Sequence, residues 1–227
     1  MSNYIILSEK SWHKDLLNDL TKSFNDDNWL LINSKIDFNL ENVEKFKPTK
    51  IFIPHWSHII PKEIHENYEC IVFHMTDLPF GRGGSPLQNL IVRGFKSTKI
   101  SALRVEEGLD TGGIYLKEPL ELNGTAEEIF SRVSLIIRKM IFKIIENKLI
   151  ASPQFGEVTE FKRRKSEESN IIGLTNLEEV YDYIRMLDCE GYPNAFIETD
   201  NLKFEFDKAI FNETEKIITA NVRIFKK

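Results

Sequence analysis

The sequence contains little of what marks a membrane, secreted or metal-binding protein. It has two cysteines, Cys70 and Cys189, among 227 residues, and no metal-ligand spacing surrounds either one. We therefore expect both to be small core residues in a reducing compartment. No apolar run approaches the roughly 18 residues that span a bilayer, and the start MSNYIILSEK shows no basic n-region or cleavage pattern. These absences predict a cytoplasmic protein that binds neither a membrane nor a metal ion.

An excess of basic residues is also missing. The formal net charge is -5 and the pI is near 5.7, whereas a general nucleic-acid binder usually shows a basic field. The balance of charges therefore predicts no nucleic-acid partner. A chain of 227 residues is long enough for one sizeable core, or for one domain plus a small appendage.

Short apolar runs alternate with helical patterns along the first two thirds of the chain. We expect buried strands at residues 4–7, 29–32, 50–54, 70–73, 99–105 and 114–122, with helices at 13–24, 85–94 and 125–144. Such alternation favours an α/β fold with a mostly parallel sheet covered on both faces. Ser85 and Pro86 predict a capped helix start, and Thr125 with Glu128 predicts a capping box. No G-x-G-x-x-G follows the first strand, so dinucleotide binding has little support.

The composition shifts near residue 152. Residues 152–170 are polar and contain the basic run KRRK at 162–165, which we interpret as a solvated linker, with a phosphate contact as the alternative. A helix at 175–187 and an alternating hairpin at 203–225 follow. We therefore predict a main domain over 1–152 and an appendage of linker, helix and small β-hairpin over 153–227. The apolar residues of the hairpin could pack on their own domain or on a second subunit. A homodimer is therefore one possible state of the protein.

A polar, glycine-rich segment, FHMTDLPFGRGGSP over residues 73–86, follows the fourth expected strand. Ligands of open α/β sheets bind at the carboxyl ends of the strands. The connection is also longer than the usual two to six residues, so we interpret it as a functional loop. His74 is its titratable candidate, and Asp110 lies 36 residues later in a second glycine-rich turn.

These two segments resemble the motifs of a known family. His74-Met-Thr-Asp-Leu-Pro79, Arg82-Gly83 and Ser85-Pro86 are similar to the H-x-S-L-L-P-x-x-R-G-x-x-P signature of the folate-dependent formyltransferases. Gly108-Leu-Asp110-Thr-Gly112 resembles their second motif, G-L-D-T-G, at a matching distance. The resemblance implies a Rossmann-like formyltransferase domain, N10-formyltetrahydrofolate as donor, and no metal. It also implies that His74 donates to a tetrahedral oxyanion and that Asp110 orients His74.

The same resemblance implies further site residues. The segment IPHWSHIIP at 53–61 looks like the lining of the family's pterin pocket, so the expected folate-binding residues are Trp56, Ile59, Ile60, Asp110 and Thr111. The residues expected to face the acceptor amine are Met75, Thr76 and Asp77. Arg82 could hold a phosphate or carboxylate, or bond to loop carbonyls. Trp12, in the first strand-to-helix turn, could stack on a sugar or base, or simply pack.

One position departs from the family pattern. Val72 stands two residues before His74, where the family usually carries asparagine. A valine side chain cannot donate a hydrogen bond, so another donor is needed at the oxyanion, and His55 or Ser57 is a candidate. Alternatively, Val72 completes a buried strand, and catalysis rests on His74, Asp110 and a backbone N–H.

The short tail decides which acceptor we expect. Only about 75 residues follow the first predicted domain, and GYPNAF at 191–196 resembles the tail of the sugar N-formyltransferases. The resemblance therefore predicts a nucleotide-linked amino-dideoxysugar, of the type used in pseudaminic-acid biosynthesis, as acceptor. The alternatives are an aminoacyl or other small amine acceptor, a non-catalytic folate or nucleotide-sugar binding module, and hydrolysis of the folate donor to formate.

Overall fold

The computed structural model describes the backbone of residues 1–227 and every side chain except that of Lys14. The chain forms two compact units. The first, here called the sheet unit, comprises residues 1–83, 98–120 and 131–160. The second, here called the tail unit, comprises residues 84–97, 121–130 and 161–227. Whether residues 1–152 fold as a domain of their own stays a prediction.

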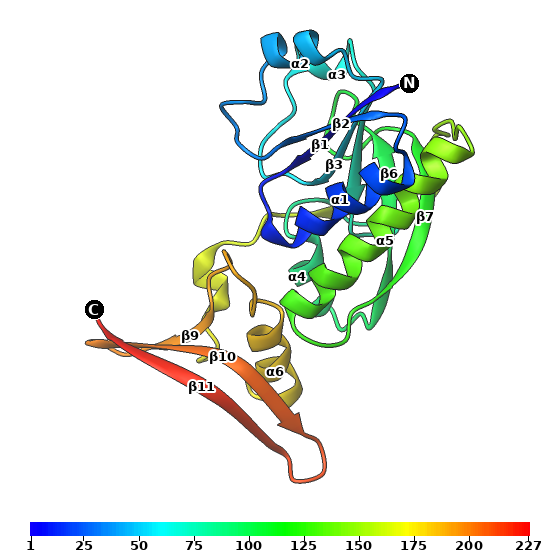
Figure 1. Cartoon of the computed structure of the whole chain (residues 1–227). Helices are drawn as coiled ribbons and strands as arrows, with labels where there is room; N and C mark the ends of the chain where they lie inside the picture. The colour runs from blue at the N-terminus through cyan, green and yellow to red at the C-terminus, as the bar shows by residue number, and fades with distance from the viewer. The chain divides into compact units, whose positions relative to one another are not determined.

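The sheet unit is built on a six-stranded sheet with the order β2-β1-β3-β4-β6-β7 (Figure 1). Its strands are β1 (Asn3–Ser8), β2 (Asn28–Ile32), β3 (Lys50–His55), β4 (Cys70–His74), β6 (Ser97–Arg104) and β7 (Ile114–Glu121). Strand β1 pairs in parallel with β2 and β3, and β3 pairs in parallel with β4. Strand β6 runs antiparallel to β4. The predicted α/β fold with a mostly parallel sheet is confirmed.

Helices cover both faces of this sheet, which explains why its strands are apolar on both sides. The helices and 3-10 turns of the chain are η1 (Ser11–His13), α1 (Lys14–Ser23), α2 (Leu40–Phe46), α3 (Lys62–His65), α4 (Pro86–Ile91), α5 (Ala126–Glu146), η2 (Ser166–Ser169) and α6 (Leu177–Arg185). On one face, Val43 of α2 and Ile64 of α3 join a core cluster with Ile5 and Ile53. Helices α1 and α5 run side by side on the sheet unit (Figure 1) and are joined within it by an ion pair.

The start of α4 differs from its prediction. Ser85 does not cap the helix: its backbone is left-handed, with φ 50°, and its side chain makes no capping bond. Its hydroxyl oxygen instead accepts the backbone N–H of Arg164 at 3.1 Å, within the tail unit. Thr125 and Glu128 do form the predicted capping box, with bonds of 3.3 and 2.8 Å.

The two cysteines form no disulfide with one another. Cys70 belongs to the core cluster of the sheet unit, and burial raises the pKa of its thiol to about 12. Cys189 is half-buried. The prediction of a small core residue is thus confirmed for Cys70.

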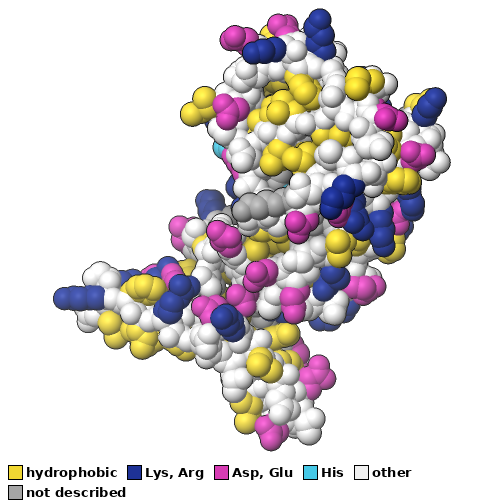
Figure 2. All heavy atoms as spheres, viewed as in Figure 1, with side chains coloured by type: hydrophobic (Ala, Val, Ile, Leu, Met, Phe, Trp, Pro, Cys, Tyr) yellow, Lys and Arg dark blue, Asp and Glu magenta, His cyan; other side chains and the backbone are white. Residues whose placement is uncertain are grey.

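The tail unit carries a three-stranded antiparallel sheet, with the order β11-β10-β9. Its strands are β9 (Ala195–Glu198), β10 (Leu202–Asn212) and β11 (Ile217–Lys226). Apolar side chains on this hairpin are exposed, among them Ile210, Ile217 and Ile224. Lysine, arginine and acidic side chains are interspersed with apolar ones over the face shown in Figure 2. Within the described part of the chain, no helix is long and apolar enough to cross a membrane.

Candidate active site

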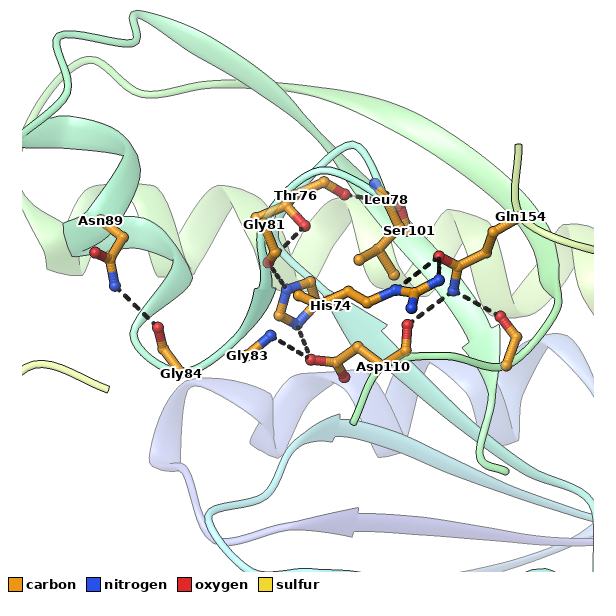
Figure 3. Close-up of polar contacts among 12 residues, drawn as sticks. His74, Thr76, Leu78, Gly81, Gly83, Gly84, Asn89, Ser101, Asp110 and Gln154 are labelled. Atoms are coloured by element: carbon orange, nitrogen blue, oxygen red, sulfur yellow. Dashed lines mark hydrogen bonds and ion pairs between the residues drawn. The ribbon is translucent and has the colours of Figure 1, made fainter. Parts of the chain in front are cut away.

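His74 ends β4 at the point where the strand passes into the glycine-rich loop. Only 7% of the residue is exposed. Its Nε2 lies 2.8 Å from the carbonyl oxygen of Gly81, in the same loop (Figure 3). Because a carbonyl oxygen only accepts hydrogen bonds, Nε2 carries the proton, and the neutral ring has its lone pair on Nδ1. The loop thereby fixes the tautomer of the ring.

Asp110 lies in the turn between β6 and β7 and approaches the other side of the ring. One carboxylate oxygen, Oδ2, accepts the backbone N–H of Gly83 at 2.9 Å and lies 3.6 Å from Nδ1 of His74 (Figure 3). That separation is too long for a direct N–H···O bond, so both atoms can bond to a third group that approaches them. The structure brings the two residues predicted to be catalytic together.

The backbone of Asp110 is unusual for a residue with a side chain. Its φ is 53°, in the left-handed region that non-glycine residues seldom adopt. The turn is also tight at Gly112, where an added Cβ would lie 1.9 Å from the carbonyl oxygen of Arg104. Conformations of this kind persist only where the surrounding structure over-determines them.

Gln154 is a part of the site that the sequence did not reveal. Its Nε2 donates to the carbonyl oxygens of Asp110 and Gly112, both at 2.8 Å. Its Oε1 accepts two hydrogen bonds from Arg82, at 3.2 Å from Nε and 2.9 Å from Nη2 (Figure 3). The residue lies 44 positions after Asp110, in a stretch interpreted as a linker, so no local spacing pointed to it.

Arg82 was expected to hold a substrate anion or to bond to loop carbonyls. Two of its guanidinium nitrogens bond instead to the side chain of Gln154. Arg82 is half-buried in β5 (Arg82–Gly83), directly before the Gly83 N–H that Asp110 accepts. Through these bonds Arg82 connects the glycine-rich loop to Gln154.

The residues expected to face the acceptor are largely turned to internal contacts. Thr76 is fully buried, and its hydroxyl donates to the carbonyl oxygen of Gly81 at 3.3 Å. Ser101 of β6 donates to the carbonyl oxygen of Thr76 at 2.7 Å and accepts the Leu78 N–H at 3.3 Å. Met75 is 7% exposed. These contacts hold the loop against β6.

Asp77 ties the same loop to two lysines on β6 and β7. Its carboxylate accepts from Lys117 at 2.5 Å and pairs with Lys99 at 2.9 Å. Lys117 also donates to the carbonyl oxygen of Leu78. Burial alone would raise the pKa of the Asp77 carboxyl, but the bonds from Lys117 and Lys99 outweigh it and lower the pKa. Both oxygens of Asp77 are therefore engaged by lysines of the sheet unit.

The expected folate-binding residues divide into packed and exposed positions. Trp56 and Ile60 pack against the core cluster of the sheet unit, and the Trp56 ring meets that of Phe38 at 5.9 Å in an edge contact. Ile59 is 93% exposed. The hydroxyl of Thr111 donates to the carbonyl oxygen of Glu107 at 2.8 Å, within its own turn.

Trp12 and two histidines form an aromatic group where β1 and β3 end. The Trp12 ring meets that of His55 edge-on at 5.8 Å. His13 is 2% exposed, and its Nδ1 lies 3.0 Å from the hydroxyl oxygen of Ser134. Burial, and then the nearby His55, lower the pKa of His13 to about 3. Burial, and then the Lys10 charge, lower the pKa of His55 to about 4.

His55 was one candidate for the donor that Val72 cannot supply. A register shift between β1 and β3 sets His55 opposite Ser8, whereas Phe52 pairs with Ile6. Val72 pairs with Ile53 of β3 and packs against the core cluster. This packing supports the interpretation of Val72 as part of a buried strand.

A cavity of about 880 Å³ opens in the sheet unit behind the Asp110 turn. Its lining includes Arg82, Thr111 and Gln154 of the loop supports, together with Lys50, Glu69 and Arg104. His74 is not among the residues that line it. The cavity therefore borders residues that support the two loops, whereas neither His74 nor Asp110 lines it. Among the described side chains, no group of three or more His, Cys, Asp or Glu residues could hold a metal ion.

A known family matches the part of the chain that includes His74 and Asp110. Residues 19–145 match the formyl transferase family over more than half of the chain, and the chain belongs to this family. Residues 166–225 match a second family, described as the C-terminal domain of methionyl-tRNA formyltransferase.

Individual relatives show which members of the family this chain resembles. The chain is similar to the solved structure of a methionyl-tRNA formyltransferase from Clostridium thermocellum, with 49% identity, a TM-score of 0.97 and 100% of each chain covered. It is 29% identical to the methionyl-tRNA formyltransferase of Wolinella succinogenes, over 68% of this chain and 51% of that protein. The chain thus spans about half the length of the curated relatives it matches. A sugar N-formyltransferase from Shewanella sp FDAARGOS_354 is 14% identical, with a TM-score of 0.67 and coverage of 97% and 96%, and shows the fold alone.

Two predictions from the sequence are wrong in the light of these relatives. A nucleotide-linked amino sugar of the pseudaminic-acid type was expected as acceptor, but the relatives at 49% and 29% identity are named for methionyl-tRNA. The exclusion of a nucleic-acid partner fails for the same reason. Net charge is a sum over the whole chain, so it hides a local basic run such as residues 162–165. The choice of a sugar acceptor also relied on the shortness of the tail, although residues 166–225 match the C-terminal domain of methionyl-tRNA formyltransferase.

Proposed function

We propose that this chain is an N-formyltransferase that moves the formyl group of N10-formyltetrahydrofolate to the amine of methionyl-tRNA. The observation that carries the proposal is the buried pair of His74 and Asp110. The likeness to two proteins named methionyl-tRNA formyltransferase supports the choice of acceptor.

The pair suits the chemistry of formyl transfer. The acceptor amine attacks the formyl carbon, a C–N bond forms, and the bond from that carbon to N10 of the folate breaks. The attacking amine must lose a proton, and the leaving N10 must gain one. Nδ1 of His74 carries the lone pair, since Nε2 donates to Gly81, and can take the proton as a general base.

The surroundings of the ring offer an acceptor on each side of it. An imidazolium would have one N–H on the Gly81 carbonyl and the other directed toward the Asp110 carboxylate. Both acceptors are fixed before reaction, by the loop and by the Gly83 N–H, so little reorganisation is needed when charge develops. His74 then returns the proton to N10 of the departing folate. The oxyanion is left to a backbone N–H.

A local basic segment supports an RNA acceptor. Lys162, Arg163 and Lys165 are exposed in the tail unit, and phosphate contacts from lysine and arginine supply most of the affinity for a nucleic acid. Arg164 is committed elsewhere: its guanidinium lies over the ring of Tyr183 and donates to the carbonyl oxygen of Glu168.

The test combines the purified protein with N10-formyltetrahydrofolate and methionyl-tRNA. The expected result is a gain of one formyl group on the methionine, with release of tetrahydrofolate. Uncharged tRNA and free methionine serve as controls for the acceptor. A reaction without acceptor measures formate release, which would identify a hydrolase instead. Folate binding with no formylated methionyl-tRNA would overturn the proposal.

A further inference from the structure

We infer that Gln154 is a positioning residue that sets the geometry of His74 through Asp110. The inference rests on the proposed formyl transfer. The Gln154 side chain touches neither His74 nor any reacting atom. Its single amide joins two loops of the sheet unit.

Every hydrogen-bonding group of the Gln154 amide is used. The two N–H groups meet the carbonyl oxygens on either side of Thr111, and the oxygen receives two bonds from Arg82. Arginine can only donate, and a backbone carbonyl can only accept. Reversing the amide would therefore break all of these bonds at once, so its orientation is set by its partners.

Those bonds fall at the strained point of the site. Asp110 holds a left-handed backbone, and its own carbonyl is one of the two that Gln154 binds. Without such a restraint, the turn can relax toward an ordinary conformation and carry the carboxylate away from Nδ1 of His74. Gln154 thus holds the backbone from which the Asp110 side chain reaches the ring.

The same amide also fixes the other side of the imidazole. Arg82 directly follows Gly81, whose carbonyl accepts from Nε2 of His74. It directly precedes Gly83, whose N–H binds the Asp110 carboxylate. By binding Arg82 and the Asp110 turn together, Gln154 ties the two acceptors of the ring to one another (Figure 3).

Two substitutions distinguish the bonds of Gln154 to Arg82 from its bonds to the Asp110 turn. Gln154→Leu keeps similar bulk and removes all of its hydrogen bonds. Gln154→Glu keeps the acceptor for Arg82 but sets a carboxylate oxygen against the carbonyls of Asp110 and Gly112. If positioning runs through the turn, both variants fail, whereas a role confined to Arg82 would leave Gln154→Glu active.

Gln88 offers a matched control. It is a buried glutamine of α4 whose amide donates to the carbonyl oxygen of Met186 at 3.1 Å, within the tail unit. Gln88→Leu therefore removes a comparable buried bond to a backbone carbonyl. It is expected to lower the melting temperature while leaving kcat within about twofold of the wild type, since it shares no partner with His74.

The experiment measures kcat, KM for N10-formyltetrahydrofolate, and the ¹⁵N signals of His74 in the free protein. We expect both Gln154 variants to lower kcat by about 10- to 100-fold, as small misplacements of catalytic groups do, with KM changed by less than about threefold. We also expect the Nδ1 signal of His74 to shift in both variants and to stay unchanged in Gln88→Leu.

The outcomes separate this inference from the proposed function. An active wild type with unaltered kcat and unaltered His74 signals in Gln154→Leu would overturn the inference alone. A wild type without formyl transfer, whose His74 signals still shift in Gln154→Leu, would overturn the function and leave the positioning role standing. A fall in kcat without any change at His74 would also overturn the inference, because the effect would then not pass through the ring.

Discussion

The Nε2 of His74 lies 2.8 Å from the carbonyl oxygen of Gly81, seven residues further along the chain. The loop that follows β4 therefore turns back on the last residue of that strand and binds the one N–H of its neutral ring. This hydrogen bond couples the glycine-rich loop to the ring, because any change that opens the loop also frees the tautomer of His74.

Removing either member of the pair should abolish most activity without unfolding the protein. We expect His74→Ala and Asp110→Asn each to lower kcat for formyl transfer by about 10²- to 10⁴-fold, the usual contribution of a positioned acid or base. Rates on methionyl-tRNA measure the effect, and thermal unfolding checks the fold. A rate within threefold of wild type in Asp110→Asn would remove that carboxylate from the mechanism.

Gly112 should tolerate no side chain. The Cβ of Gly112→Ala would lie 1.9 Å from the carbonyl oxygen of Arg104, which is backbone and cannot give way cheaply. We expect the variant to lose roughly 2 kcal/mol or more of its free energy of unfolding, measured by urea denaturation. Gly173→Ala is the control, because nothing lies within 4 Å of the added carbon. Equal stabilities for the two variants would contradict the geometry of the turn.

The two lysines that hold Asp77 should differ in their effect on stability. Lys117 binds both the carboxylate and the carbonyl of Leu78, so Lys117→Met should cost roughly 1–2 kcal/mol. The side chain of Lys99 is 49% exposed and meets Asp77 alone, so Lys99→Met should cost less than about 0.5 kcal/mol. Urea unfolding at low and high salt measures both. The opposite order would show that the loop is not anchored through Lys117.

Stability should fall on the acid side of neutrality because of His13. Its pKa in the folded protein is lowered to about 3, chiefly by burial, so between that value and about 6.5 the unfolded chain binds a proton that the folded chain does not. This contribution is complete above pH 6.5 and is lost as the pH falls, by about 2 kcal/mol at pH 5.

The comparison of two histidine variants tests that sign. The free energy of unfolding of His13→Gln should change less between pH 7 and pH 5 than that of the wild type. His58→Gln, at an exposed position, is the comparison variant. An equal loss of stability for wild type and His13→Gln over this range would assign the effect to other groups, such as His55.

The basic run of the tail unit should contribute to RNA binding by neutralising phosphates. We expect Lys162→Ala with Lys165→Ala to weaken binding of methionyl-tRNA. The slope of log K against log salt should become shallower by about 0.7–0.9 for each phosphate that is no longer neutralised. The control replaces two exposed lysines of the sheet unit, Lys22 and Lys45. If the control pair lowers the slope as much as the test pair, the footprint does not centre on the tail.

Much of the fold could be predicted because its strands are short and continuously apolar. Runs such as Tyr4–Leu7 and Cys70–Phe73 are buried on both faces of a parallel sheet, and that burial leaves a clear pattern. The start of α4 could not be predicted in the same way. A serine before a proline usually caps, yet the Ser85 hydroxyl accepts from Arg164, 79 residues away, and no local pattern reports such a bond.

The site was accessible from the sequence only in part. His74 and Asp110 stand in two motifs with a recognisable spacing, and their neighbours follow from it. Gln154 acts by bonding to backbone carbonyls and to Arg82, and this role leaves no signature in the residues around it. The predicted acceptor was wrong because neither the length of the tail nor the net charge of the whole chain reports where the cations lie.

The left-handed backbone at Asp110 sets stability and activity against each other at a single position. Asp110→Gly would adopt φ 53° without strain, and this relief opposes the loss of the carboxylate that accepts the Gly83 N–H and lies beside His74. A melting temperature near that of the wild type would therefore not show that the carboxylate beside His74 is still present. A melting temperature can be used to judge whether a variant keeps this site only when Asp110 is unchanged.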